Sequence, residues 1–469
     1  ILCIFAAKFF TIMSNHIRLR KGLNIPLKGK ASNQITKHIS SNIVAVKPSD
    51  FRNFSPKLLI KEGDAVLAGS PVLADKKNLS VRLCSPVSGT VKEIVRGEKR
   101  KLLAVLIEND HKNERLQFTT LSKNAKKEEI IERLLEGGLW PAIKQRPYGI
   151  IPNPDVEPKS IFISGFDSSP LAPDLDFTLK GEMDAIQAGI DVLNLLTKGG
   201  IHLSLNIDNF AGSPFHRIER VIFHTFEGPH PAGNVGIQIN HIDPINKGDI
   251  VWTIDLYSLA AIGKLFTRGI YDVKKIIAVT GPRCINPSYV ECLPGMCMSD
   301  IKEYSDENSG VKNSNLPIRW ISGNVLTGVN VGANGYTGFF HNQVTLISEG
   351  KYYEMLGWIK PFRSKKFSIS RTYFSWLNHK KQYELDTNTN GDERAFVMTG
   401  VYEKVLPMDI YPTYLLKAIL AEDIDNMEAL GIYEVIEEDF ALCEFVCPSK
   451  IKIQEIISKG IDLMLKEMA

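Results

Sequence analysis

A pair of cysteines near the C-terminus is the most specific candidate for a cofactor site in this sequence. Residues Cys443 to Pro448 read CEFVCP, which matches the end of the C-x₂-C-x₂-C-x₃-C-P run that binds iron–sulfur clusters. Counting back in threes places Glu437 and Phe440 at the first two ligand positions. Because four thiolates normally hold such a cluster, we interpret Cys443 and Cys447 as remnants of a lost iron–sulfur motif, buried in a helical turn.

Residues 136–143 (EGGLWPAI) form the second candidate, a glycine-containing loop that could bind the phosphate of a flavin. Such loops need small residues, since backbone N–H groups must approach the phosphate closely. Leu139 and Trp140 are bulky instead, so we predict that this segment binds no flavin. A later glycine cluster, Gly328 to Gly335, lacks the G-x-G-x-x-G spacing and opens no predicted helix, which favours turns.

Lys76 is the third candidate, because a repeated strand-turn-strand unit surrounds it. The arms GDAVLAGSPV (63–72) and SPVSGTV (85–91) predict a small flattened barrel with a pseudo-twofold axis. They resemble the biotinyl/lipoyl carrier family, in which a hairpin presents a modified lysine, and Asp75 and Lys76 fall near that hairpin. The tip reads DKKN here, and the arm that follows it is longer than in carriers. A modifying enzyme recognises hairpin geometry, so we predict that Lys76 is unmodified.

Histidines and the remaining cysteines provide no recognisable metal or nucleophile pattern. His224, His230 and His241 are separated by six and eleven residues, without the i, i+4 pair or C-x-x-C motif of zinc sites. Cys292 and Cys297 are similarly isolated. No Ser/His/Asp or Cys/His signature occurs either. We therefore expect neither a metal site nor a catalytic triad.

Composition indicates an ordinary globular protein of several domains. The chain has 469 residues, 44% of them hydrophobic and 23% charged, which fits about three domains of ~150 residues and excludes a disordered chain or a disulfide scaffold. The formal net charge of +3 gives no basic footprint for nucleic acid. Seven cysteines, an odd and sparse number, favour a reduced, intracellular protein.

The apolar run from Ile1 to Met13 is too short to span a membrane, which takes about twenty apolar residues, and Lys8 interrupts it. It also lacks the basic segment and cleavage site of a signal peptide. We expect Met13 to be the true start of the protein. The longest stretch without charged residues, Trp320 to Ser348, is rich in Gly and Asn and predicts strands and turns. We therefore expect no transmembrane helix.

The elements that must position these candidates change type along the chain. Short alternating runs predict strands in the barrel, and strands alternating with helices beyond residue 123 predict a doubly wound layer. Towards the C-terminus the periodicity is helical, with breaks at Gly431 and Pro448. The predicted α+β/α/β multidomain protein has an N-terminal extension and lead-in (1–34), a lipoyl/biotinyl-like barrel-sandwich hybrid (35–115), a Rossmann-like α/β domain (116–270), a β-grasp, SLBB-like domain (271–338), an irregular β-rich segment (339–410) and a helical C-terminal domain (411–469).

Hydrophobic periodicity also predicts the individual elements. Strands are predicted at 161–164, 201–205, 220–224, 250–254 and 275–281. Helices are predicted at 127–135, 179–198, 299–304, 411–420, 423–430, 437–445 and 451–468, and one more helix ends at residue 266.

The domain order resembles two related electron-transfer families. One is the flavin- and iron–sulfur-bearing subunit of respiratory complex I, and the other is the RnfC component of the Rnf ferredoxin:NAD oxidoreductase. Both families carry the flavin loop G-R-G-G-A-G-F-P and a C-x-x-C-x-x-C motif. Here the loop reads EGGLWPAI, the later acidic stretch has become GFDSSP at 165–170, and the cysteine motif is incomplete. What remains is a relative without these cofactors.

Several stretches resemble the NqrA family of components in sodium-translocating NADH:quinone reductases (NQR). The most specific are FEGPHPAG at 226–233 and CEFVCPSK at 443–450, and the likeness extends from about Asn15 to the C-terminus. The others are KGLNIP (21–26), SPVSGTV (85–91), RGEKR (96–100), IGKLF (262–266), LGW (356–358) and KFSISRT (366–372).

This resemblance implies a peripheral, cofactor-free subunit on the cytoplasmic face of the bacterial inner membrane. The implied complex has five other subunits, which carry the flavins and iron–sulfur centres, and it passes electrons from NADH to ubiquinone while exporting sodium. This subunit would act at the quinone-reducing end. The family motifs mark no catalytic residue; His230 is the candidate nearest to quinone chemistry, and a structural turn is the alternative for it. An Rnf-type electron-transfer subunit and a lipoyl or biotin carrier are the alternative functions.

Overall fold

The computed structural model describes residues 16–120, 125–306, 316–350, 352, 363, 366–369, 377–378 and 380–467. The expected start at Met13 lies outside the described residues, as do the motif at 356–358 and the end of the motif at 366–372. Within the described ranges, no helix is both long enough and apolar enough to cross a membrane.

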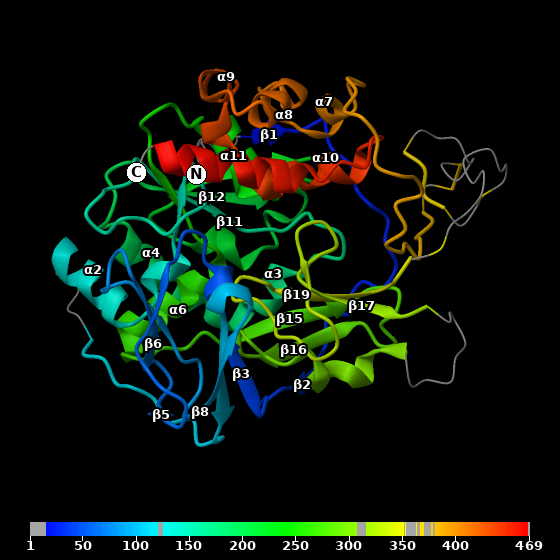
Figure 1. The fold of residues 1–469 in the computed structure, drawn as a ribbon. Helices are drawn as coiled ribbons and strands as arrows, with labels where there is room; N and C mark the ends of the chain where they lie inside the picture. The colour runs from blue at the N-terminus through cyan, green and yellow to red at the C-terminus, as the bar shows by residue number, and fades with distance from the viewer. Residues whose placement is uncertain are drawn as a thin grey trace, which may run out of the picture.

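A six-stranded sheet forms the centre of the molecule (Figure 1). Two further strands flank the four inner ones: β1 (His16–Arg18) pairs parallel with β13, and β10 (Lys144–Arg146) lies antiparallel to β14 at the other edge. The inner strands run parallel in the order β13-β12-β11-β14, with bounds β11 (Ile161–Ser164), β12 (Ile201–Asn206), β13 (Ile222–Glu227) and β14 (Val251–Thr253). The four predicted strands of this region are therefore confirmed, with β13 beginning two residues later than predicted.

α4 (Met183–Leu193) lies between β11 and β12 and α5 (Val235–Ile242) between β13 and β14, whereas only 3-10 turns lie between β12 and β13. A crossover between parallel strands needs such a long connection. On one face α4 packs against α6 (Leu256–Arg268). α6 begins after Asp255, whose carboxylate accepts the backbone N–H groups of Tyr257 and Ser258. The helix predicted at 179–198 is shorter than expected, since a 3-10 turn precedes α4. The predicted helix at 127–135 is α2 (Lys127–Glu136).

Neighbouring residues of strand β11 point into two different hydrophobic cores. Ile161 and Ile163 belong to the core that also contains α4, α6 and the barrel, whereas Phe162 belongs to the core shared with the C-terminal helices. This alternation follows from the two-residue period of a strand. The sheet is thus covered on both faces by parts of the chain that are far apart in sequence.

The segment before the central domain forms the predicted barrel from two small sheets. Val66, Val72, Val87 and Val91, from both arms of the internal repeat, are buried in its core. The first sheet contains β3 (Ile43–Val46), β9 (Leu102–Asn109), β8 (Gly89–Arg96) and β5 (Ala65–Val66), and the second contains β4 (Pro56–Leu58), β6 (Pro71–Asp75) and β7 (Arg82–Cys84).

A third sheet follows the central domain, and it is mixed. The predicted strand at 275–281 is its central β15, which pairs antiparallel with β16 and parallel with β19. β2 lies at the start of the range predicted for the barrel, and it pairs here with β16. The strands in order are β18 (Val329–Asn330), β17 (Ile318–Ser322), β19 (Gln343–Ser348), β15 (Lys275–Thr280), β16 (Ser288–Cys292) and β2 (Ile35–His38). The predicted helix at 299–304 is a 3-10 helix, and part of the predicted irregular segment 339–410 lies outside the described residues.

The C-terminal part is helical, as predicted, and is coloured orange and red in Figure 1. The helix predicted at 437–445 begins as a 3-10 turn, η12 (Glu437–Phe440), before α10. The α-helices are α7 (Tyr402–Val405), α8 (Pro412–Leu420), α9 (Ile424–Ala429), α10 (Ala441–Val446) and α11 (Ile453–Glu467).

Arg146, at the end of β10, joins these helices to the central sheet. Its guanidinium donates to Asp439 Oδ2 and to Glu438 Oε1, each at 2.7 Å, and the side chains of Arg146 and Asp439 are only 2% and 0% exposed. Asp439 Oδ2 also accepts the backbone N–H of Ile436 at 2.9 Å, which fixes the turn that carries it. A charge buried this deeply is tolerated only with such partners.

We predict that Arg146→Ala lowers the free energy of unfolding by about 3–5 kcal/mol, because it leaves the buried Asp439 carboxylate unpaired. The matched control is Arg18→Ala, which removes an ion pair with Glu227 from a side chain that is 66% exposed and should cost about 1 kcal/mol or less. Urea unfolding followed by tryptophan fluorescence measures both. Equal losses for the two variants would contradict the role of Arg146.

Candidate functional site

A cavity of about 470 Å³ lies at the carboxyl ends of β11 and β12. Ligands of α/β proteins bind outside this edge of the sheet, because the loops that follow the strands converge there. The loop after β11 supplies most of the lining (165–169 and 171–176). The lead-in segment, the end of β12 and the residues after it, and one more residue supply the rest (25–27, 30, 205–206, 209, 213 and 382). The stretch GFDSSP, which replaces the acidic stretch of electron-transfer relatives, therefore forms one wall.

The turn that carries His230 packs directly behind this wall. The backbone N–H of His230 donates to Asn24 Oδ1 at 2.8 Å, and its carbonyl accepts the N–H of Leu23 at 2.8 Å. Its Nδ1 lies 3.1 Å from the hydroxyl of Ser168. Gly22 has φ +136°, and a Cβ there would overlap the His230 carbonyl, so no other residue fits. The two motifs KGLNIP and FEGPHPAG thus meet in space.

His230 serves as a positioning residue in this arrangement. It is 4% exposed, and burial lowers the pKa of its imidazole to about 4, so the ring is neutral at pH 7. Ser168 lies between the ring and the cavity: its hydroxyl contacts His230 and also accepts the backbone N–H of Gly233 at 2.8 Å. The geometry fits the structural-turn alternative for His230.

Carboxylates and amides share the lining with apolar side chains. Asp176 accepts hydrogen bonds from the hydroxyl of Ser213 and from the amide of Asn209. Burial raises the pKa of Asp176, and the nearby Asp174 raises it further. The hydroxyl of Ser169, which is 8% exposed, has no hydrogen-bond partner among the described residues. The cavity can therefore hold a ligand with both apolar and polar groups, and its lining residues bring together no nucleophile and base.

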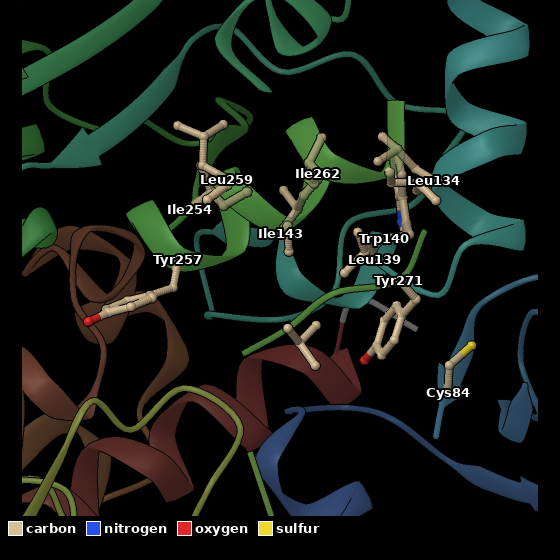
Figure 2. Close-up of a cluster of buried hydrophobic side chains, with 14 of the residues drawn as sticks. Cys84, Leu134, Leu139, Trp140, Ile143, Ile254, Tyr257, Leu259, Ile262 and Tyr271 are labelled. Atoms are coloured by element: carbon tan, nitrogen blue, oxygen red, sulfur yellow. The ribbon is translucent and has the colours of Figure 1, made fainter. Parts of the chain in front are cut away.

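The glycine-containing segment at 136–143 is part of the hydrophobic core. Leu139 and Trp140 are fully buried, and Figure 2 shows both among the side chains of the cluster that includes Tyr271 and Cys84. Gly138 has φ +66°, and a Cβ there would overlap Cys84 Sγ. The N–H groups of residues 137, 138 and 139 donate to carbonyls of the preceding helix at 2.9, 3.2 and 3.0 Å. With these donors used, the segment does not fit a flavin phosphate.

Cys443 and Cys447 also take part in packing. Both are fully buried, and burial raises the pKa of the Cys443 thiol, which keeps it protonated. Cys447 Sγ lies 3.0 Å from the hydroxyl of Tyr402. At the other two ligand positions, Glu437 pairs with Arg52 and Phe440 is buried in the core. These side chains do not fit an iron–sulfur cluster.

Lys76 lies on a hairpin tip that is tied to the neighbouring loop. Its side chain is exposed, but its backbone N–H donates to the carbonyl of Ser55 at 2.8 Å. Asp75 Oδ1 accepts the N–H groups of Ser55 and Lys77, both at 3.1 Å. Lys77 Nζ donates to Asn53 Oδ1 at 2.7 Å. These contacts fix the backbone conformation of the hairpin tip on which a modifying enzyme would have to act.

The other histidines and cysteines are dispersed. His224 does not lie beside His230 or His241. Its partner is His202, whose Nδ1 lies 2.9 Å from the Nε2 of His224. Burial lowers the pKa of His224 to about 4. In the part of the chain that the structure describes, no group of three His, Cys, Asp or Glu side chains could hold a metal ion. Sequence reasoning missed His202. Its position in the predicted strand 201–205, which precedes the predicted strand carrying His224, was the signal that could have paired the two histidines.

Comparison with known proteins assigns the family. Two family models match: the NqrA N-terminal barrel-sandwich hybrid domain over residues 17–110 and the NqrA second alpha/beta domain over residues 125–271. The chain is 35% identical to the NqrA component of the Na(+)-translocating NADH-quinone reductase of Rhodopirellula baltica, over 96% of this chain and 98% of that protein. The corresponding protein from Neisseria meningitidis serogroup A is 36% identical over 96% of this chain and 100% of its own length. The chain belongs to the NqrA family.

The two NqrA domain models correspond to the barrel and to the central sheet with its helices. The resemblance expected from the sequence is thereby confirmed. Among solved structures, an NAD+-reducing NiFe hydrogenase aligns over 73% of this chain and 61% of its own, with a TM-score of 0.34 and 11% identity.

We predict that Lys76 carries neither lipoyl nor biotinyl groups, because its hairpin tip is held against Ser55 and Asn53. Peptide mass spectrometry of the full chain, purified from cells that lipoylate and biotinylate their own carriers, measures this directly. Lys76→Arg is the matched control, and its peptide should differ from the parent only by the substitution. A lipoyl or biotinyl mass increment on the parent peptide would overturn the prediction.

We predict that His230 makes the protein less stable in acid. Its folded pKa of about 4 lies below the unfolded value of about 6.5, so its stabilisation is full above pH 6.5 and is lost as the pH falls towards 4. The loss amounts to at most about 3 kcal/mol. His230→Gln should therefore lose less stability than the parent between pH 7.5 and 4.5 in urea unfolding. His38→Gln, at a 74% exposed side chain, should behave like the parent; a His230→Gln curve parallel to the parent's would disprove the assignment.

Proposed function

We propose that this chain acts as the NqrA component of a Na(+)-translocating NADH:quinone reductase. The supporting observation is similarity along almost the whole chain, at 35–36% identity, to relatives that carry this name and that it matches over 98–100% of their length. A subunit uses several of its surfaces in a complex, and similarity over the full length includes the residues that form each of them. The complex then oxidises NADH, reduces ubiquinone and exports sodium, and this chain works at the quinone-reducing end.

We further propose that the subunit binds no flavin or iron–sulfur cluster of its own. This part rests on the site geometry: the N–H groups after α2 are already bonded, and Cys443 and Cys447 have Glu437 and Phe440 in place of two further thiolates. The flavins and iron–sulfur centres then belong to the five partner subunits. The same geometry disfavours the alternative function of an Rnf-type electron-transfer subunit. The hydrogen bonds that hold the hairpin at Lys76 disfavour a lipoyl or biotin carrier.

Ubiquinone is the ligand we propose near the cavity at the ends of β11 and β12. His230 would support its wall through Ser168 without touching the quinone, because the ring lies behind that residue. We place the subunit peripherally on the cytoplasmic face of the bacterial inner membrane, held by protein partners. A net charge of +3 favours this mode, since it gives little attraction to anionic lipid.

The finer fold assignments belong to the same proposal. The order β13-β12-β11-β14 of the central sheet is the 3-2-1-4 order of a Rossmann-like fold. In the third sheet, an antiparallel β15–β16 pair beside a parallel β15–β19 pair supports a β-grasp, SLBB-like domain.

Expression with and without the other five subunits tests this function. Alone, the full chain should stay in the supernatant after ultracentrifugation. Expressed together with the five partners, it should pellet with the membranes, withstand a high-salt wash and co-purify after mild solubilisation. A chain that fails to co-purify, while the other five subunits assemble with a known NqrA protein, would refute the proposed function.

A further inference from the structure

Ser169, on the loop after β11, contributes a buried hydroxyl to the cavity at the ends of β11 and β12. Its side chain is 8% exposed, yet its Oγ makes no hydrogen bond to any described residue. The Asp167 carboxylate lies near enough to be influenced by this hydroxyl, but the hydrogen bond that it accepts, at 2.7 Å, comes from the backbone N–H of Ser169. Because a buried hydroxyl without a partner is costly, a ligand in the cavity is the partner that this group lacks.

The other two serine hydroxyls in the lining of this cavity are already engaged. Ser168 Oγ lies 3.1 Å from Nδ1 of His230. The hydroxyl of Ser213 donates to Asp176 Oδ1 at 2.6 Å. Among the three serines that line the cavity, Ser169 therefore has the hydroxyl that is available to a ligand.

The backbone around Ser169 is held in place by both neighbouring domains. The carbonyl of Ser169 accepts the N–H of Ala172 at 3.1 Å, within its own loop. The next carbonyl, that of Pro170, accepts a hydrogen bond from Nε2 of Gln343 at 3.2 Å, and Gln343 lies on β19 of the third sheet. Because these bonds fix the loop before a ligand enters, the hydroxyl is preorganised for binding.

The charges around the cavity disfavour an anionic partner for this hydroxyl. The lining contains the carboxylates of Asp167, Asp174 and Asp176 and the ammonium of Lys30. Even with Asp176 protonated, two carboxylates would face one ammonium. Like charges repel more strongly away from bulk water, so the diphosphate of a dinucleotide, which the Rossmann-like strand order would otherwise suggest, does not suit this site. A neutral acceptor such as a carbonyl oxygen meets no such repulsion.

The rest of the lining suits an apolar ring. Ile25, Leu27 and Leu205 are buried, at 7%, 4% and 2% exposure, and they line the cavity together with Phe166 and Leu171. The volume of about 470 Å³ lies within the range of small-molecule sites, about 300–1,000 Å³. The ligand that fits is therefore neutral and largely apolar, with a hydrogen-bond acceptor that reaches Ser169.

We propose that Ser169 donates a hydrogen bond to one ring carbonyl of ubiquinone, whose ring lies against the apolar part of the lining. A quinone has the required chemistry, because its two carbonyl oxygens are neutral acceptors on an otherwise apolar ring. Ser169 is then a substrate-binding residue, whereas His230 supports the wall from behind Ser168. The inference rests on the proposed function, from which it takes the quinone, and it assigns the contact that holds the ring.

Isothermal titration calorimetry of the full chain with a ubiquinone that carries a single isoprenoid unit tests this contact. Ser169→Ala should weaken binding by about three- to tenfold, the range expected for one hydrogen bond. Ser169→Thr keeps a hydroxyl and should bind within about twofold of the parent. Ser160→Ala is the matched control: Ser160 is 4% exposed at the opposite end of β11, where its hydroxyl lies 3.5 Å from the carbonyl of Gly199, and its removal should leave binding unchanged. Melting temperatures establish that all variants are folded.

Infrared difference spectroscopy provides a readout that a purely structural role of Ser169 would not change. The same ubiquinone is isotope-labelled at one ring carbonyl and, in a second sample, at the other. Bound to the parent chain, one carbonyl band should lie at lower frequency than in an apolar solvent, because a hydrogen bond weakens the C=O bond. Ser169→Ala should return this band to the frequency of the free carbonyl, and Ser169→Thr should not.

The outcomes separate this contact from the proposed function. If the parent binds the quinone and Ser169→Ala binds within about twofold of it with unchanged carbonyl bands, the inference is wrong. If the parent binds no quinone, the inference is also wrong, whereas co-purification with the five partners would still support the proposed function. A titration with NADH forms the last arm: binding of NADH that Ser169→Ala weakens would replace the quinone by a nucleotide and overturn the inference.

Discussion

A single buried guanidinium fixes how the C-terminal helices sit on the central sheet. Arg146 extends from β10, and its partners Asp439 and Glu438 lie on the η12 turn, far away in sequence. Water cannot reach Arg146 and Asp439, so their separation would leave two unsolvated charges. The core shared by the central sheet and the C-terminal helices depends on this junction, because it is formed between the two parts that Arg146 joins.

The two segments that resemble cofactor motifs both take part in core packing. Leu139 and Trp140 occupy the core under α6, and Gly138 allows the close approach of Cys84. Cys443 and Cys447 fill space beside Tyr402. In each case a backbone or thiol group that could bind a cofactor is instead bonded or buried.

The sequence predicts much of this fold because most elements carry a local signal. Long periodic helices such as α6 and α11, and the buried strands β11 and β15, occur where the pattern places them. β1 and β2 were not predicted, since strands of three and four residues have no readable period and pair with partners distant in sequence. The segments that meet behind the cavity wall were recognisable as the motifs at 21–26 and 226–233, but their meeting through Asn24, Ser168 and His230 is a tertiary contact that no local pattern contains.

We propose that the segments resembling cofactor motifs, residues 136–143 and Cys443 with Cys447, serve packing and bind no cofactor. Absorption spectroscopy combined with flavin and iron analysis tests it most directly, on the full chain purified fresh under anaerobic conditions. We expect a colourless protein without a flavin band or the broad absorbance of an iron–sulfur cluster, because neither residues 136–143 nor Cys443 and Cys447 offer free ligands. Stoichiometric flavin or iron bound to the chain would contradict it.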